Sequence, residues 1–204
     1  MDKLLDSLQN VFGNKFLEYF MEQDKKHKYL QLDDYQKVIQ KFIDDEQFFR
    51  TNYYSGNHVH FTRFLLVSIE KFKNNDRTID FTELNHKGKL IWELEHIIPQ
   101  SDFELGDSDK NKLGNLTLLH RDINVKISNK NFEEKKKVLH EEDESKFYIN
   151  EVFRRNNFKK SDIDKRSNDL KNDLKNDLVD IINNHFDAYC EKVLKIKNME
   201  LNNE

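Results

Sequence analysis

Apolar residues recur at helical spacing before and after a central region of the chain. Residues 1 to about 50 show this pattern twice, which predicts helices there. The clearest example is the segment 61–72, FTRFLLVSIEKF, whose apolar side chains fall on one helical face. These side chains are Phe61, Phe64, Leu65, Ile69 and Phe72. The sequence therefore predicts a buried helix here, ended by the polar residues 74–77.

Two short apolar runs interrupt the helical pattern in the centre. Residues 90–97 form a β-like run ending in EHIIP, and Pro99, the only proline, would end a strand and force a turn. The run 116–119 is apolar and contains Thr, so it predicts a second strand. A polar loop containing DSDKNK is expected between them, and the composition from about residue 122 to 140 predicts another helix. If the two runs pair as strands and this helix packs across them, the end of the first strand, the start of the second and the first turn of the helix lie close together.

The C-terminal third is predicted to be helical. One helix is expected around 144–156, and another begins near Ser161, which suits an N-cap because Asp164 follows three positions later. An apolar stripe then continues through Leu170, Leu174, Leu178, Ile181, Ile182 and Phe186. The near-repeat NDLKNDLKNDL fits a partner-binding helix or, as we favour, a helix packed on its own domain. The last residues, NMELNNE, are expected to fray.

The composition supports a mostly helical fold and excludes several classes of protein. Five glycines and one proline are few breakers for 204 residues, and 35% of the residues are charged. The single cysteine, Cys190, excludes an internal disulfide and a cysteine-based zinc site. No apolar stretch has the length of a membrane span, and the N-terminus lacks a signal-peptide pattern. A cytoplasmic location without membrane contact is therefore expected.

The net charge of −4 argues against a protein that simply coats a polyanion, but local basic clusters leave contact with nucleic acid open. One cluster contains Lys126, Lys130, Lys135, Lys136 and Lys137. A second contains Arg154, Arg155, Lys159, Lys160, Lys165 and Arg166. Taken alone, each cluster is more often a solvated helix face than a binding site.

The DSDKNK stretch resembles a calcium loop only in its first positions. Asp107, Asp109 and Asn111 have the alternating spacing of such a loop. However, Lys112 stands where the sharp turn needs glycine, and Leu118 stands where a bidentate glutamate is needed. We therefore reject a calcium site here.

A stronger set of polar residues comprises Glu95, His96, Asn115 and Asn124. Oxygen ligands from Glu95 and Asn124, with positions left for water, suit Mg²⁺ or Mn²⁺. A neutral His96 nearby can take a proton from an attacking water, and a metal can stabilise the charge on a phosphoryl group. These residue types are common, so on these residues alone a structural role is slightly favoured.

The order of motifs around these residues resembles a known nuclease family. The chain reads EHIIPQ, then LGNLTLL at 113–119, then Asn124, then Ser128, Asn129, Lys130, Phe132 and Lys135. This set is similar to the HNH, or ββα-metal, nuclease domain at the C-terminus of GmrSD-like modification-dependent restriction enzymes. The resemblance covers roughly residues 50–186, and the nine-residue step from Asn115 to Asn124 agrees with the wider HNH pattern.

The resemblance implies a fold and a set of roles. The fold is α+β and mostly α, a single nuclease domain over 1–204 with N-terminal helices in 1–88, a ββα-metal core in 89–140 and C-terminal helices in 141–204. His96 would be the general base, Asn115 would orient the loop that bears it, and Glu95 and Asn124 would be ligands of Mg²⁺ or Mn²⁺. DNA contacts are expected from Lys126, Asn129, Lys130, Lys135 and His120, with a structural role for His120 as the alternative.

Three functions remain to be separated. The leading hypothesis is a metal-dependent endonuclease that nicks or cuts DNA, modified DNA included, in restriction or phage defence. The resemblance implies a nucleotide-hydrolysing sensor domain or subunit as partner, because such a region usually precedes the nuclease domain in that family. No Gly-rich phosphate loop occurs in this sequence. The second hypothesis is a catalytically silent nucleic-acid-binding or regulatory module of a larger defence complex. The third is a helical interaction protein whose C-terminal helix binds a partner.

Overall fold

The computed structural model describes residues 40, 43–55, 58–74, 83, 85, 86, 89–142 and 146–181. Its elements, with 3₁₀ helices written η, are α4 (Gln47–Arg50), α5 (His58–Lys73), β1 (Trp92–His96), α6 (Asp107–Lys110), η1 (Leu113–Asn115), β2 (Leu116–His120), α7 (Arg121–Ile127), α8 (Phe132–Glu141), η3 (Tyr148–Arg154) and α9 (Lys160–Ile181). The helices expected in residues 1–39, Cys190 and the fraying of NMELNNE lie outside the described residues.

The two predicted strands pair as an antiparallel sheet, and the helices around it make the fold mostly helical, as expected. Glu95 lies opposite Thr117, and His96 lies opposite Leu116. The hydrogen bond from the main-chain nitrogen of Ile97 to the Asn115 oxygen, at 2.8 Å, continues the pairing just beyond the strands.

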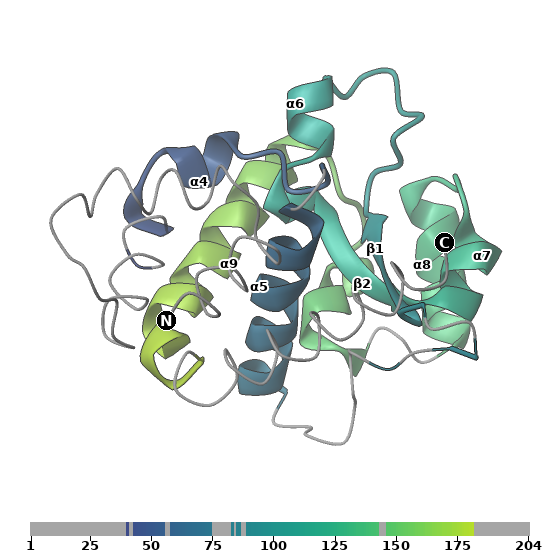
Figure 1. Cartoon of the computed structure of the whole chain (residues 1–204). Coiled ribbons are helices and arrows are strands. Elements are labelled where there is room, and N and C mark those ends of the chain that lie inside the picture. Colours follow the sequence, from purple (N-terminus) through teal and green to yellow (C-terminus); the bar gives the residue numbers. More distant parts are fainter. Residues whose placement is uncertain are drawn as a thin grey trace, which may run out of the picture.

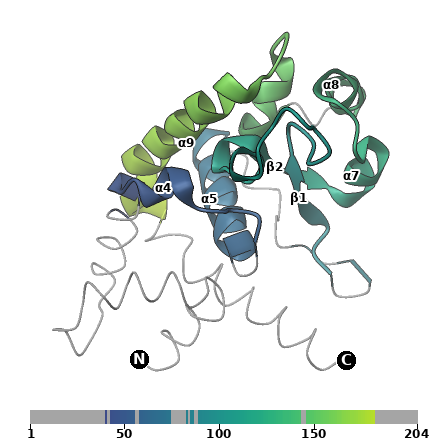
Figure 2. The same cartoon turned by 90° about the horizontal axis from the view of Figure 1, so that it is seen from above.

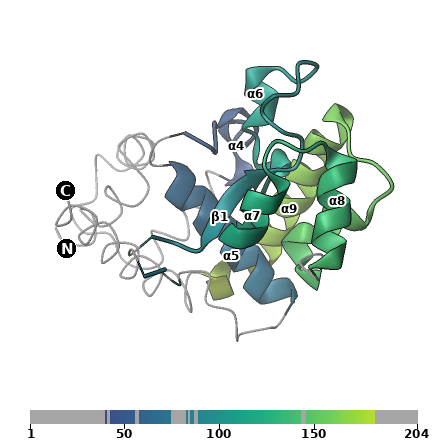
Figure 3. The ribbon, with the colours of Figure 1, turned by 90° about the vertical axis from the view of Figure 1, so that its right-hand side faces the viewer.

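Helices cover both faces of this small sheet. Figures 1 and 2 show α5 and α9 side by side on one side of the strands, and α7 and α8 on the other. Figure 3 faces the second side and shows α7 in front of β1, with α8 beside it. Burial on both faces explains why β2 is apolar almost throughout: Leu118 belongs to the core towards α5, and Leu119 belongs to the core towards α7 and α8.

The buried helix predicted over 61–72 is present as α5. Four of its five predicted apolar side chains are buried and Phe72 is half-buried. The helix begins at His58, earlier than the apolar spacing indicated, and ends at Lys73, next to the expected polar stop. It packs against α9 and the sheet, so it forms one wall of the core.

The single helix expected from about 122 to 140 is in fact two. Ser128 has a φ of 42°, in the left-handed region, and this ends α7. Asn131 then starts α8 with a capping box: its side chain accepts a hydrogen bond from the Glu134 nitrogen at 3.0 Å, and Glu134 accepts one from the Asn131 nitrogen at 3.1 Å. The turn between the helices reverses the chain beside the end of β1.

Three smaller expectations are corrected. The polar loop containing DSDKNK includes the short helix α6, because carbonyls at its start accept main-chain hydrogen bonds. The helix expected at 144–156 is the 3₁₀ helix η3. Ser161 is not an N-cap: α9 begins at Lys160, and Asp162 accepts a hydrogen bond from the Lys159 nitrogen at 2.8 Å.

The long helix α9 packs on the domain itself, in agreement with the interpretation that we favoured. Leu170 and Leu174 are buried in the core shared with α5. The side chains further along the predicted stripe lie outside the described part of the chain. Within the described residues, none of the helices has both the length and the apolar character that crossing a membrane requires.

Replacing Gly114 by alanine is expected to destabilise the fold by about 3 kcal/mol, because η1 lies against the backbone of α9. A Cβ at this position would lie 2.0 Å from the main-chain oxygen of Ile163 and 2.8 Å from the main-chain nitrogen of Ser167. Urea unfolding measures the effect. Gly106→Ala is the control, because a Cβ there meets nothing within 4 Å. Equal stability of the two variants would contradict the close packing.

Candidate active site

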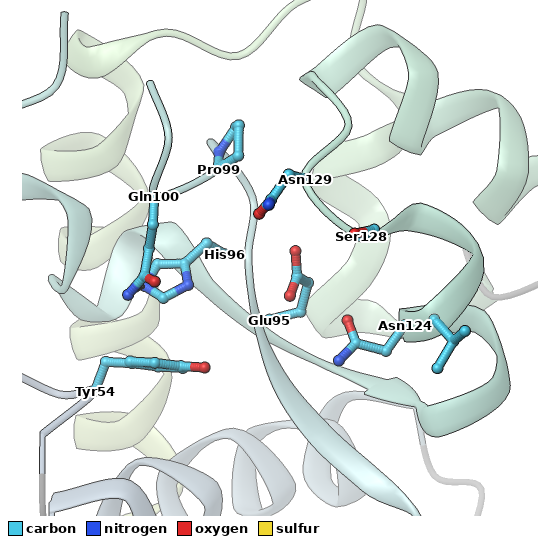
Figure 4. Close-up of a pocket in the computed structure, with 9 residues that line it drawn as sticks. Tyr54, Glu95, His96, Pro99, Gln100, Asn124, Ser128 and Asn129 are labelled. Atoms are coloured by element: carbon cyan, nitrogen blue, oxygen red, sulfur yellow. Dashed lines mark hydrogen bonds between the residues drawn. The ribbon is translucent and has the colours of Figure 1, made fainter. Parts of the chain in front are cut away.

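A cavity of about 410 Å³ opens where β1 ends beside α7. It is lined by Tyr54, Glu95, His96, Pro99, Gln100, Asn124, Val125, Ser128 and Asn129. Figure 4 shows the side chains of Glu95, Asn124 and Asn129 pointing towards a common space, with His96 and Tyr54 across from them. The structure therefore brings together four residues to which the sequence assigned chemistry: Glu95, His96, Asn124 and Asn129.

His96 is held firmly in the wall of this cavity. Its side chain is nearly buried, at 4% exposure, and its ring lies against the Tyr54 ring with 4.2 Å between centroids. Its Nε2 atom is 3.0 Å from Oδ1 of Asn111 and 3.4 Å from the side-chain nitrogen of Gln100. We assign the tautomer from the shorter contact: an amide oxygen only accepts, so Nε2 is taken to carry the hydrogen and Nδ1 to be the acceptor.

The environment of His96 keeps its imidazole neutral. Burial lowers the pKa of His96 to about 4, and the hydrogen bond with Asn111 opposes this effect only in part. At pH 7 the ring is therefore uncharged and able to accept a proton.

Glu95 forms an ion pair with Lys135. Burial raises the pKa of the Glu95 carboxyl, while the adjacent Lys135 ammonium acts in the opposite direction. Lys135 also donates a hydrogen bond to the main-chain oxygen of His96. The sequence predicts a nucleic-acid contact at Lys135, but the structure leaves its side chain 0% exposed, with the ammonium turned towards β1. Lys135 is thus part of the support of the site and not of its surface.

Asn124 has the property expected of a metal ligand. Its side-chain nitrogen donates to Glu93 at 2.8 Å, while its Oδ1 is buried and has no hydrogen-bond partner. A buried oxygen without a donor is costly unless something binds it. In the described part of the chain, no three His, Cys, Asp or Glu residues gather around a metal position. A cation here would take one carboxylate, one amide oxygen and water, a donor set that fits Mg²⁺ or Mn²⁺.

Asn115 is fully buried and fastens the segment that follows β1. Its Oδ1 accepts from the Ile98 nitrogen at 2.8 Å, and its side-chain nitrogen donates to the oxygens of Ile98 and Lys110 at 3.1 and 2.9 Å. Its hydrogen bonds therefore fix the loop beyond His96 and do not reach the imidazole. It lies in η1, one residue before β2.

Two residues from outside the EHIIPQ segment touch the imidazole and were not found from the sequence. Asn111 lies in the stretch that was weighed only as a calcium loop, and its role depends on how α6 places it beside His96. Tyr54 lies far upstream and has no local motif around it. Only the folding of distant segments against each other brings these side chains to the site.

The remaining residues assigned to DNA contact lie on or near α7. Lys126 is exposed and pairs with Glu142, and Lys130 donates to the main-chain oxygen of Lys126. His120 caps α7 by accepting from the Asp122 nitrogen at 3.3 Å. Its ring also meets the Trp92 ring edge-on, which supports a structural role.

The comparisons with known proteins identify the family of the chain. Residues 36–173 match the model of a protein family, the C-terminal domain of GmrSD restriction endonucleases. The chain belongs to this family. The GmrSD C-terminal match covers more than half of the chain and includes the whole cavity, so it confirms the resemblance found from the motifs. No curated protein and no solved structure matches the chain.

Proposed function

We propose that this chain is a metal-dependent DNA endonuclease of the HNH, or ββα-metal, type, which acts in the restriction of modified or foreign DNA. The observation that carries the proposal is the pairing of a neutral, buried His96 with an unpartnered Asn124 oxygen on one cavity. A general base and an oxygen ligand that line one cavity are what metal-assisted hydrolysis requires. Membership of a restriction-endonuclease family supports DNA as the substrate.

His96 would act as the general base through Nδ1. A water oxygen bonds to phosphorus, the P–O bond to the leaving strand breaks, and the proton of the water passes to Nδ1. The leaving oxygen takes a proton from solvent. The hydrogen bond from Nε2 to Asn111 and the contact with Tyr54 hold the ring, so this chemistry needs no reorientation of the base.

Glu95 and Asn124 would hold the cation. When bound, Mg²⁺ or Mn²⁺ supplies positive charge that stabilises the phosphoryl group during hydrolysis. Glu95 presents its carboxylate from β1, and Asn124 presents its amide oxygen from α7, where the hydrogen bond to Glu93 fixes the amide orientation. Asn115 has a positioning role, because it fixes the loop that follows the base.

DNA would lie across the face that carries α7 and the turn after it. Lys126, Asn129 and Lys130 are polar side chains that follow Asn124 on α7 and in the turn after it, and they would contact phosphates without reading the base sequence. A silent binding module would not need an unpartnered oxygen beside a neutral histidine, so the geometry favours the nuclease.

Glu95→Gln and Asn124→Ala are expected to raise the Mn²⁺ concentration needed for half-maximal plasmid nicking by about 10- to 100-fold. The first removes the negative charge of a ligand, and the second removes a ligand oxygen. The measurement is nicking of supercoiled plasmid across a Mn²⁺ titration. Glu133→Gln, an exposed carboxylate on α8, is the matched control and should leave the titration unchanged. An unchanged titration in both ligand variants would remove these residues as metal ligands.

A further inference from the structure

A fully buried lysine lies against two residues of the site. Lys135 is the fourth residue of α8, and its side chain is 0% exposed. A lysine is almost never fully buried unless its charge is paired, because removing an ammonium from water costs several kcal/mol. The reason for this burial therefore lies in what the ammonium contacts.

The ammonium of Lys135 contacts two residues of the candidate site. It pairs with the Glu95 carboxylate and donates to the main-chain oxygen of His96. One cation thus joins the proposed metal ligand to the backbone of the proposed base, although these residues lie about 40 positions away in sequence.

The start of α8 is built to hold Lys135 in place. The capping box of Asn131 and Glu134 fixes the first turn. The main-chain nitrogen of Lys135 donates to the main-chain oxygen of Asn131 at 3.0 Å. Phe132 stacks against Phe153 and Phe158 with 5.5 and 5.9 Å between ring centroids. A lysine on this anchored turn has little freedom to move away from β1.

The charge balance of the cavity follows from this contact. Among the described residues that line the cavity, Glu95 is the one carboxylate, and Lys135 compensates its charge. The affinity of an oxygen site for a divalent cation depends on how many negative ligands it offers. Glu93, which accepts from Asn124 outside the lining of the cavity, pairs with Arg121 at 3.8 Å. The protein alone therefore offers a cation little net negative charge, and a phosphate of bound DNA would supply more.

We propose that Lys135 is a positioning residue that holds Glu95 and the His96 main chain in one arrangement. Its charge also keeps the affinity of the cavity for divalent cations low until a DNA phosphate completes the set of ligands. This inference rests on the proposed nuclease function. Coupling between the two ligands is reciprocal, so a cation would also tighten DNA binding by the factor by which DNA tightens cation binding.

The first test compares Lys135→Met with the wild type by calorimetric titration with Mn²⁺ in the absence of DNA. Methionine keeps much of the side-chain length and removes the charge. The variant is expected to bind Mn²⁺ about tenfold more tightly, because a positive charge beside the ligand carboxylate is gone. It is also expected to nick plasmid at least about tenfold more slowly, because Glu95 and His96 lose their shared support.

Lys137→Met is the matched control, since Lys137 is exposed on the same helix and should match the wild type in both assays. Mn²⁺ affinity that is unchanged or weaker in Lys135→Met would overturn the proposal, because a purely structural lysine gives that result. Failure of the wild type to nick plasmid would count against the nuclease function instead, while the Mn²⁺ comparison would still decide the role of Lys135.

A second variant covers the case in which Lys135→Met does not fold. The double variant Glu95→Gln with Lys135→Met removes both charges of the pair. It is expected to fold even if Lys135→Met does not, and to unfold at a higher temperature if Lys135→Met does fold, because no carboxylate is left buried without a partner. A double variant that is no more stable than the single one would show that the two charges do not depend on each other, and would overturn the proposal.

Discussion

Replacing His96 by alanine is expected to lower DNA cleavage by about 10²- to 10⁴-fold, the contribution of a general base, while the fold is kept. The reason is the state and position of the imidazole, which is neutral and lines the cavity. Its Nε2 atom contacts Asn111, so its acceptor atom, Nδ1, takes no part in that contact. No other histidine lines the cavity among the described residues. A plasmid-nicking time course measures the loss.

Two controls separate a chemical role of His96 from a structural one. Circular dichroism and salt-dependent DNA binding should remain close to wild type in His96→Ala, because phosphate contacts come from other residues. His140→Ala removes an exposed histidine at the end of α8 and should cleave normally. If His96→Ala loses folding and cleavage together, the residue supports the structure and the assignment of the base is wrong.

Replacing Arg166 by leucine is expected to destabilise the fold by about 4 kcal/mol. Arg166 lies on α9, is 5% exposed, and donates to the main-chain oxygens of Gly114, Leu116 and Ile149 at 3.0, 2.9 and 2.8 Å. A longer bond, at 3.4 Å, reaches the oxygen of Leu113. Leucine fills much of the space but leaves these buried oxygens without their donor.

The contacts of Arg166 tie together the parts of the fold that carry the site. One guanidinium joins α9 to η1, to the first residue of β2 and to η3. Burial lowers the pKa of Arg166 to about 9, which reflects the cost of keeping this cation away from water. Urea unfolding measures the effect, and Arg155→Leu, at an exposed position, is the control. A loss below about 1 kcal/mol in Arg166→Leu would contradict the role of this network.

The helices and strands whose apolar residues follow a clear pattern along the chain could be predicted from the sequence. The helix α5 follows from apolar residues at helical spacing, and the strands follow from short apolar runs bounded by Pro99 and by polar residues. The break between α7 and α8 was missed although a signal was present: Asn131 with Glu134 three positions later is a capping-box pattern inside an otherwise helical composition. Local propensity favoured one continuous helix, but the capping box at Asn131 starts a second helix there.

The polar side chains were harder to place, because tertiary contacts decide their roles. Lys135 and Arg166 were assigned to basic clusters because of their charge. Both are buried, and each donates hydrogen bonds to main-chain oxygens of distant segments. Asn111 and Tyr54 carry no motif, and only packing places them on His96. The motif residues Glu95, His96 and Asn124 did converge on one cavity. Two paired strands followed by a helix that packs on them place the end of the first strand next to that helix.

The most direct test of a metal-dependent nuclease site at the end of β1 is the nicking of supercoiled plasmid by the purified wild-type chain in Mn²⁺, in Mg²⁺ and in EDTA. We expect conversion to the open-circular or linear form with at least one metal, none in EDTA, and at least about 100-fold slower conversion with His96→Ala. Cleavage that persists in EDTA, or equal cleavage by His96→Ala, would contradict it. No cleavage by the wild type with either metal would favour the silent binding module.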